Sequence, residues 1–382
     1  MEKLKMLLVS YSRLVSDARI LKQINLFKDD YELTTCGYGP APTGAAAHYQ
    51  IPDEAAYWRR NRVETILRLY TRAYWSSPAS AWCRENLSRG GFDVCFADDI
   101  DTAGLALWLR PRCGVHADLH EYSPREKEDV WRWRVFVKPY MEWQVRHFVT
   151  RADSVTSTAT KFCEEYQRNF GVDAKLVVNA SPYADLNPTP LPEPGQPLRL
   201  VHAGAGREDR YLETMIDSVA ALPGRYTLDM YLTANNAAYV AQLGEYAART
   251  PNVRVLPGVP YHELIPTLNR YDLGIHNLPP VNFNNRYALP NKFFDFVQAR
   301  LGMVVGPSPE MVSRLDKYHL GRAATDFTAE ALRVALEQTT REEVAQWKQN
   351  AAAHAREMSS ETVVGTWRDA VAAIVATDPS AP

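Results

Sequence analysis

Residues 198–210 read LRLVHAGAGREDR, and the expected fold class follows from them. The first half is a short apolar run of strand length that ends in Gly204 and Gly206, and a helix is predicted to follow at about 209–221. A buried strand, a glycine turn and a helix in this order begin a Rossmann-like unit. The alternation continues through predicted strands at 226–232, 253–256, 273–276 and 303–305.

The segment before this strand is rich in proline. Six prolines and Gly195 lie between residues 182 and 197. Proline lacks a backbone donor and breaks both helices and central strands. Residues 183–197 are therefore predicted to be an interdomain linker.

The N-terminal half repeats the same alternation. Predicted strands lie at 5–10, 31–36, 92–97, 115–118, 154–157 and 175–178, with helices between them that include 102–110 and 159–170. This pattern predicts an α/β protein of two doubly wound, Rossmann-like domains that face each other across a cleft. Residues 1–182 and 198–360 form these two domains, and an amphipathic helix at 361–376 is predicted to complete the first.

Composition excludes several other classes of protein. The 382 residues include 46% hydrophobic and 23% charged residues, and the formal net charge of −2 gives no global field that would favour nucleic acid. No apolar run approaches the roughly 18 residues of a membrane span, which predicts a cytoplasmic protein. The scattered cysteines form no C-x-x-C pair and are expected to be reduced, without a zinc site: Cys36, Cys83, Cys95, Cys113 and Cys163.

Ligands of open α/β sheets bind beyond the carboxyl ends of the strands, so the residues that follow each strand are the candidates for a site. His120 and Glu121 follow the strand at 115–118. Such a pair can hydrogen-bond a sugar hydroxyl and stabilise developing positive charge. The alternative is a local helix cap formed by Glu121 and Ser123, with His120 satisfied nearby.

The turn at 204–210 is a second candidate. Gly204 lets backbone amides approach a phosphate, while Arg207 and Arg210 add charge-assisted donors suited to a pyrophosphate. The alternative is a tight turn that carries two solvated arginines.

The stretch ALPNKFFDFV at 288–297 is a third candidate. Pro290 stands where a helix would begin, which places Asn291 and Lys292 at the end of that helix that attracts anions. Asp295 lies about one turn later, where a carboxylate can accept both hydroxyls of a ribose.

These segments together resemble the GT-B glycosyltransferases, in particular the retaining glycosyltransferase family four, over nearly the whole chain. LPNKFFD at 289–295 with GMVV at 302–305 is similar to that family's "lPnKlfEy…Glpvv" stretch. DLHE at 118–121 resembles the segment beside its reaction centre, and DSVTS at 153–157 resembles its "aD-vit-s" strand.

The resemblance implies a nucleoside-diphosphate sugar donor, UDP- or GDP-linked, bound by the C-terminal domain, with no required metal or cofactor and with retention. The N-terminal domain would take a glycan, lipid-linked or small-molecule acceptor. Carried over residue by residue, it assigns catalysis to His120 and Glu121, the diphosphate to Arg210, Arg207, Lys292, Asn291 and Gly204, the ribose to Asp295, the nucleobase to Val259 and Pro260, and the acceptor side to Ser16, Asp17, Arg19 and Asp98.

One departure leaves alternatives open. The family often has a glutamate at the position of Tyr287, and that glutamate usually touches the donor sugar. A hydrolysing sugar-nucleotide epimerase on the same architecture, or a binding protein that has lost catalysis, therefore remain as competing readings. Asp99 and Asp101 form a D-x-D, but after a parallel strand they are expected to cap a helix rather than bind metal.

Two stretches, 55–90 and 130–151, interleave arginines with tryptophans and tyrosines. Basic, aromatic, amphipathic surface is typical of the membrane interface, and it would hold the protein at the inner face of the cell membrane. The alternative is a set of ordinary helices that cover the sheet with solvated arginines.

Overall fold

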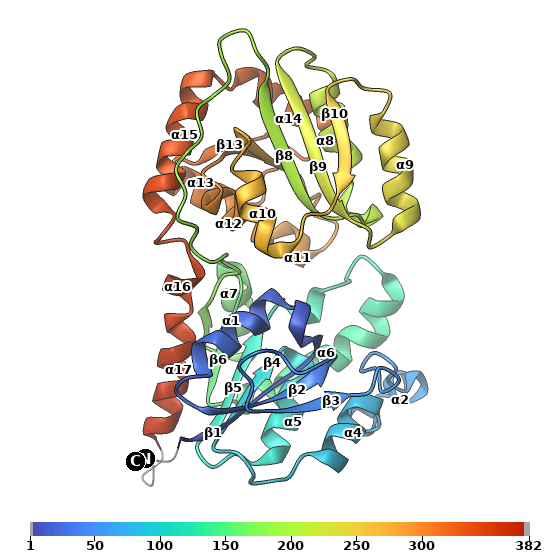
Figure 1. The fold of residues 1–382 in the computed structure, drawn as a ribbon. Helices are drawn as coiled ribbons and strands as arrows, with labels where there is room; N and C mark the ends of the chain where they lie inside the picture. The colour runs from blue at the N-terminus through green and yellow to red at the C-terminus, as the bar shows by residue number, and fades with distance from the viewer. Residues whose placement is uncertain (1–2, 378–382) are drawn as a thin grey trace. The chain divides into compact units, whose positions relative to one another are not determined.

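The computed structural model describes residues 3–377, and these form two compact units. Unit 1 contains the chain up to Val178, the short segment Asn282–Asn284 and the residues from Val364 onward. Unit 2 contains Asn179–Val281 and Asn285–Val363. Each unit is a parallel sheet with helices on both faces (Figure 1).

Unit 1 holds a seven-stranded parallel sheet in the order β3-β2-β1-β4-β5-β6-β7. Its central strands read as continuous apolar runs because both faces are covered; Met6, Leu7, Leu8 and Val9 of β1 are fully buried. The strands are β1 Lys5–Arg13, β2 Glu32–Tyr38, β3 Ala47–Ile51, β4 Val94–Asp98, β5 Gly114–Leu119, β6 Ser154–Ser157 and β7 Ala174–Leu176.

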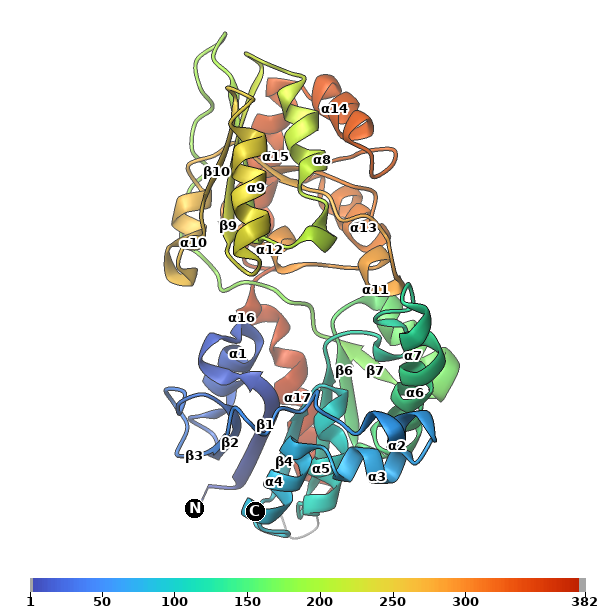
Figure 2. The same ribbon diagram turned by 90° about the vertical axis from the view of Figure 1, so that its right-hand side faces the viewer.

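The helices of unit 1 cover this sheet. They are α1 Ala18–Phe27, α2 Arg62–Ile66, α3 Tyr70–Trp75, α4 Pro78–Asn86, α5 Ile100–Leu109, α6 Lys138–His147, α7 Thr160–Phe170 and α17 Gly365–Ala376, with the π-helical turn η3 Trp133–Val137 before α6. The last helix, α17, packs against β4, β5 and β6 although it is far from them in sequence (Figure 2).

Unit 2 repeats the arrangement with six parallel strands in the order β10-β9-β8-β11-β12-β13. They are β8 Leu198–Ala205, β9 Tyr226–Thr233, β10 Val253–Pro257, β11 Leu273–His276, β12 Gly302–Val305 and β13 Gly321–Ala323. The helices are α8 Glu213–Ala220, α9 Ala237–Ala247, α10 Tyr261–Leu268, α12 Asn291–Gln298, α13 Pro309–Tyr318, α14 Ala329–Gln338, α15 Arg341–His354 and α16 Ser360–Val363. The short helix α11 Phe283–Arg286 begins in unit 1 and ends in unit 2.

The predicted α/β class with two doubly wound, Rossmann-like sheets is confirmed. Several boundaries differ from expectation. The strand expected at 175–178 is β7 Ala174–Leu176, and the helix expected at 209–221 begins only at Glu213, after the 3-10 turn η5 Glu208–Arg210. The predicted tail helix is two helices, of which α16 belongs to unit 2 and α17 to unit 1.

The proline-rich segment has no helix or strand, and it lies along unit 2. Thr189 donates to the Asn269 carbonyl at 2.9 Å, and Arg300 donates to the Leu186 carbonyl at 3.1 Å. These bonds fix the segment to one surface. None of the helices within residues 3–377 combines the length and the apolar character that crossing a bilayer takes.

Candidate functional site

Both sheets share one topological feature. The strand order reverses between β1 and β4 in unit 1, and between β8 and β11 in unit 2. Ligands of doubly wound folds bind outside the carboxyl ends of the strands at such a switch point. Most of the residues that the sequence singled out lie at one of these two places, and each place is described within its own unit.

In unit 1, the ends of β4 and β5 bring Asp98, Asp118 and His120 together. The Nε2 atom of His120 lies 2.9 Å from Asp98 Oδ1 and 4.0 Å from Asp118 Oδ2. Ser10, at the neighbouring position of β1, donates to Asp98 Oδ2 at 3.0 Å. The His120 side chain keeps about a quarter of its surface exposed (26%), whereas both carboxylates are buried.

The charge state of His120 follows from this contact. Burial disfavours the imidazolium, but the Asp98 carboxylate beside it outweighs burial and raises the pKa of His120 to about 10. At neutral pH the ring is therefore a cation that donates hydrogen bonds. It is not available as a general base.

Asp118 is held from the other side by Arg19. The guanidinium donates twice, with Nε to Oδ2 and the second nitrogen to Oδ1, each at 2.7 Å. Burial alone would raise the pKa of Asp118, but this bidentate pair holds it well below its usual range. Gln23 joins the two carboxylates by donating to Asp98 at 3.0 Å and to Asp118 at 2.8 Å.

The other acceptor-side predictions lie at the start of α1. Arg19 is 5% exposed, so its guanidinium points inward to Asp118 and to the Val177 carbonyl. Asp17 caps α1 by accepting from the backbone N–H of Arg19 at 3.0 Å. Ser16 is exposed and donates to the Arg13 carbonyl.

The Glu121 carboxylate contacts a residue that is distant in sequence. Its Oε2 accepts from the side-chain amide of Asn284 at 2.9 Å, within unit 1. The alternative of a local cap is not seen, because no side-chain hydrogen bond caps the 3-10 turn Ser123–Arg125.

Asp99 is a residue that the sequence predicted only as a cap. It does cap α5, accepting from the Ile100 N–H at 2.8 Å, but its backbone has φ 69° and ψ 165°, a region that is essentially restricted to glycine. Burial raises the pKa of its carboxyl to about 7 despite the nearby His120. A strained residue with a titrating carboxyl at a strand end is typical of a functional site.

Asp98, Asp118 and His120 are close enough to share a metal ion, with ligand atoms within 4.8 Å of one another. The carboxylate oxygens already accept from Ser10, Gln23 and Arg19, and the Arg19 guanidinium supplies the positive charge. These contacts do not favour a metal at this place.

In unit 2, Lys292 extends from the first turn of α12 over Gly204 at the end of β8. A Cβ atom added to Gly204 would come within 2.5 Å of Lys292 Nζ. A side chain at this position would therefore displace the ammonium from the end of β8. Burial and the positive charge of Arg210 lower the pKa of Lys292 to about 8.

Two histidines that the sequence analysis missed lie beneath this lysine. His202 of β8 and His276 of β11 stack with ring centroids 5.7 Å apart, and both are buried. Burial and the charge of Lys292 lower the pKa of His202 to about 3 and that of His276 well below its usual value. Neither ring nitrogen of His276 has a hydrogen-bond partner among the described residues.

The arrangement therefore places two cationic donors, Lys292 and Arg210, near two neutral histidines around the β8 turn. His202 donates its one ring proton, on Nδ1, to the Ile275 carbonyl at 2.9 Å. Burial and positive charge keep both histidines neutral, so the charge that would attract an anion here is that of Lys292 and Arg210. The signal for the histidines was present in the sequence, since each interrupts an apolar strand close to its carboxyl end.

The other residues of unit 2 that were predicted to bind the diphosphate or the ribose lie in or next to η5 and in α12. Arg207 forms an ion pair with Asp209 at 2.7 Å and is half exposed, whereas Arg210 approaches Asp209 only to 3.9 Å. Asn291 is the exposed first residue of α12. Asp295 is buried and accepts from the Ser181 hydroxyl at 2.5 Å.

Val259 and Pro260 follow β10, and Pro260 immediately precedes α10. Tyr287, where the resembled family often has glutamate, lies between α11 and α12 and is partly buried.

Together, the two Rossmann-like units and their strand orders define a GT-B fold. Solved structures with this fold match the chain over nearly its full length. Trehalose 6-phosphate synthase from Burkholderia multivorans matches with a TM-score of 0.70 at 10% identity, covering 99% of this chain and 100% of that one. Anabaena HepE, in complex with UDP and glucose, matches with a TM-score of 0.66 at 12% identity, covering 97% and 99%.

WaaG, a glycosyltransferase involved in lipopolysaccharide biosynthesis, matches with a TM-score of 0.60 at 13% identity, covering 96% of this chain and 98% of that one. No protein-family model and no curated protein sequence matches the chain. The likeness is therefore one of fold, and the recognition of a GT-B architecture from sequence is confirmed.

Proposed function

We propose that the protein is a glycosyltransferase that moves a sugar from a nucleoside-diphosphate sugar to a glycan, lipid-linked or small-molecule acceptor, with retention. The observation that carries the proposal is the position of Lys292 over Gly204 beside Arg210 at the switch point of unit 2. Ammonium and guanidinium groups at a helix start and a glycine turn suit a pyrophosphate.

In the proposed reaction, the bond between the anomeric carbon and the diphosphate oxygen breaks, and a bond from that carbon to an acceptor oxygen forms. The acceptor hydroxyl proton leaves with the diphosphate or passes to solvent. Lys292 and Arg210 would stabilise the charge that develops on the leaving group, a role worth about 10²–10³ in rate for one well-placed donor. No metal is needed for this role.

His120 would act on the sugar as a cationic hydrogen-bond donor, because Asp98 keeps it protonated. Asp295 would accept from the ribose, and Val259 with Pro260 would flank the base. The complex of the GT-B protein HepE with UDP and glucose supports a uridine donor, with a guanosine donor as the second choice.

The first experiment is a binding screen. Isothermal titration calorimetry with UDP, GDP and TDP is expected to show one of them binding to the intact protein, and Arg210→Ala is expected to weaken that binding strongly. Arg249→Ala is the matched control, because Arg249 is an exposed arginine of unit 2 just after α9 that is not assigned to the donor. Equal effects of the two substitutions would count against the assignment of Arg210.

The second experiment separates the competing functions. Turnover of the donor sugar with no acceptor and with epimerised product would indicate an epimerase, whereas tight binding without turnover on any acceptor would indicate a binding protein. For a transferase, nuclear magnetic resonance of the product is expected to show the anomeric configuration of the donor retained.

A further inference from the structure

Exposed apolar side chains are concentrated on one part of unit 1. Fifteen large hydrophobic side chains are exposed among the described residues, and eight of them lie in two segments: Trp58, Val63, Ile66, Leu67, Leu69, Val130, Trp131 and Val135. We call the surface formed by residues 58–72 and 130–138 the basic apolar surface. It includes α2, the start of α3 and η3.

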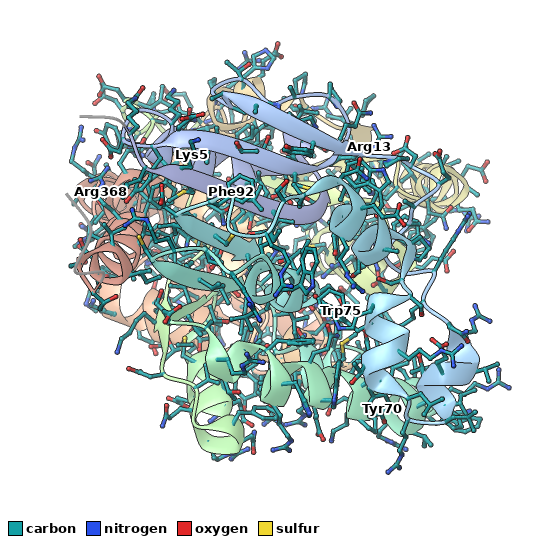
Figure 3. All side chains as sticks on the ribbon, turned by 90° about the horizontal axis from the view of Figure 1, so that it is seen from below. Lys5, Arg13, Tyr70, Trp75, Phe92 and Arg368 are labelled. Carbon is teal, nitrogen blue, oxygen red and sulfur yellow. The ribbon has the colours of Figure 1, made fainter. Side chains whose placement is uncertain are left out.

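The two segments lie side by side. Helix α2 packs against η3, and side chains from both line a depression of about 380 Å³ that includes Trp58, Ile66, Arg132 and Phe136. Arg60 stacks 5.1 Å from the ring centroid of Tyr140, just after the second segment. The α3 end of the surface can be located in Figure 3 by Tyr70, which is labelled there with Trp75.

Two exposed leucines of this surface flank a turn. Leu67 is 63% exposed and Leu69 is 47% exposed, and between them Arg68 adopts a left-handed backbone with φ 59°. Holding an arginine in this conformation presents two leucines to solvent at the junction of α2 and α3. Trp131, 58% exposed, supplies a comparable group from the other segment.

The charge of the surface is strongly positive. Residues 58–72 contain five arginines and one glutamate, and residues 130–138 contain two arginines and one lysine with no acid. The acids around it are paired: Glu64 with Arg72, Glu126 with Lys127, Glu128 with Arg125 and Glu142 with Lys138. Asp129 is the adjacent exposed carboxylate that opposes the positive charge.

Five exposed arginines have no carboxylate partner within residues 3–377: Arg59, Arg62, Arg68, Arg132 and Arg134. A surface that exposes aliphatic side chains and tryptophans between unpaired arginines matches the boundary of an anionic bilayer, where acyl chains accept the first and phosphate headgroups the second. A nucleic acid would satisfy the arginines and leave the leucines in water.

We propose that the basic apolar surface docks unit 1 onto a bilayer of anionic phospholipid. Leu67, Leu69 and Trp131 insert at the level of the headgroups, and the unpaired arginines bind lipid phosphates. The inference does not depend on the proposed transferase activity, because the surface and the diphosphate site lie in different units.

The test is flotation of the full-length protein with vesicles of equal parts phosphatidylglycerol and phosphatidylcholine. Binding is expected at low salt and is expected to weaken as salt increases. The double variant Leu67→Gln with Trp131→Gln should reduce partitioning at least about tenfold, and each of Arg62→Gln and Arg68→Gln should reduce it about fivefold.

The matched controls are Tyr49→Gln, an exposed aromatic elsewhere in unit 1, and Arg249→Gln, an exposed arginine of unit 2, and both should bind as the unchanged protein does. All of these positions are exposed, so circular dichroism and melting temperature should not change. Absence of binding at low salt, or equal binding to pure phosphatidylcholine vesicles, would overturn the proposal.

A protein partner is the other outcome to be separated. Sedimentation velocity should show the same oligomeric state for the unchanged chain and for the Leu67→Gln, Trp131→Gln variant. A dimer that this variant converts to a monomer would show instead that the surface binds a second copy of the chain.

Discussion

At the scale of single residues, the fold moves the pKa values of two side chains in opposite directions: that of His120, which follows β5, and that of Lys292, in the first turn of α12. Asp98 keeps His120 protonated well above neutral pH, while burial and Arg210 bring the pKa of Lys292 down to about 8. His120 is thus a fixed donor, whereas the charge on Lys292 responds to what binds beside it.

The lowered pKa of Lys292 leads to a prediction of how the affinity for a nucleoside diphosphate depends on pH. An anion beside the ammonium raises its pKa in the complex above the value of about 8 in the free protein, so binding is coupled to proton uptake above that pH. Affinity should be nearly constant from pH 7 to 8 and then fall, by at most about tenfold per pH unit.

Calorimetry with UDP or GDP from pH 7 to 10 measures this, a range in which the terminal phosphate, with a pKa of about 6, stays ionised. Lys292→Arg is the control, since a guanidinium keeps its charge throughout. If the affinity of the unchanged protein depends on pH as little as that of Lys292→Arg, the placement of Lys292 at the anion is contradicted.

Asp99 gives a prediction about stability. Both Asp99→Gly and Asp99→Ala lose the cap on α5, but only glycine relaxes the backbone at φ 69°. Asp99→Gly should therefore be more stable than Asp99→Ala by about 1 kcal/mol or more, measured by urea unfolding. Equal stability, or a more stable alanine variant, would show that the backbone at this position is not strained.

The candidate site was predictable where the chain itself carries the signal. Lys292 could be predicted because Pro290 marks the start of its helix, and Gly204 could be predicted because it ends an apolar strand. The network around Asp118 was not predictable, because Arg19, Gln23 and Trp367 reach it from distant parts of the sequence. His202 and His276 were missed because each is a single histidine in an apolar strand, and no other residue at a recognisable motif spacing marks it as part of a site.

At the scale of elements, the strands buried on both faces were the easiest to predict. β1 and β4 contain continuous apolar runs, and β8 is apolar apart from Arg199 and His202. The edge strands β3 and β13 went unpredicted, since β3 is largely exposed and β13 has only three residues. The break before α8 was also missed, because the residue with the left-handed backbone there is Tyr211 and not glycine, the residue that usually indicates this conformation.

Helix α17 contributes a large buried side chain to the core of unit 1. Trp367 is 1% exposed, donates to Thr156 at 3.2 Å and lies under Arg19, 4.7 Å from its guanidinium carbon. Trp367→Ala should destabilise the protein by about 3–5 kcal/mol, as for other buried aromatic side chains. Chemical denaturation measures this loss.

The comparison variant is Trp131→Ala, which removes an exposed tryptophan and should change stability by less than about 0.5 kcal/mol. If both substitutions cost the same, α17 does not contribute to the core of unit 1 as its packing indicates.

At the scale of the whole molecule, one strand order occurs twice with a different charge balance at its switch point. In unit 1 the carboxylates of Asp98 and Asp118 are each paired with a cation, His120 and Arg19 respectively. In unit 2 the cations Lys292 and Arg210 lie near neutral histidines. A positive site of the second kind suits the diphosphate of a sugar nucleotide.

The most direct test is a crystal structure of the protein with UDP or GDP, whichever binds more tightly. The account predicts diphosphate oxygens at hydrogen-bonding distance, about 2.7–3.2 Å, from Lys292 Nζ and from the guanidinium of Arg210, above Gly204. A bound nucleotide whose phosphates contact neither side chain would contradict it.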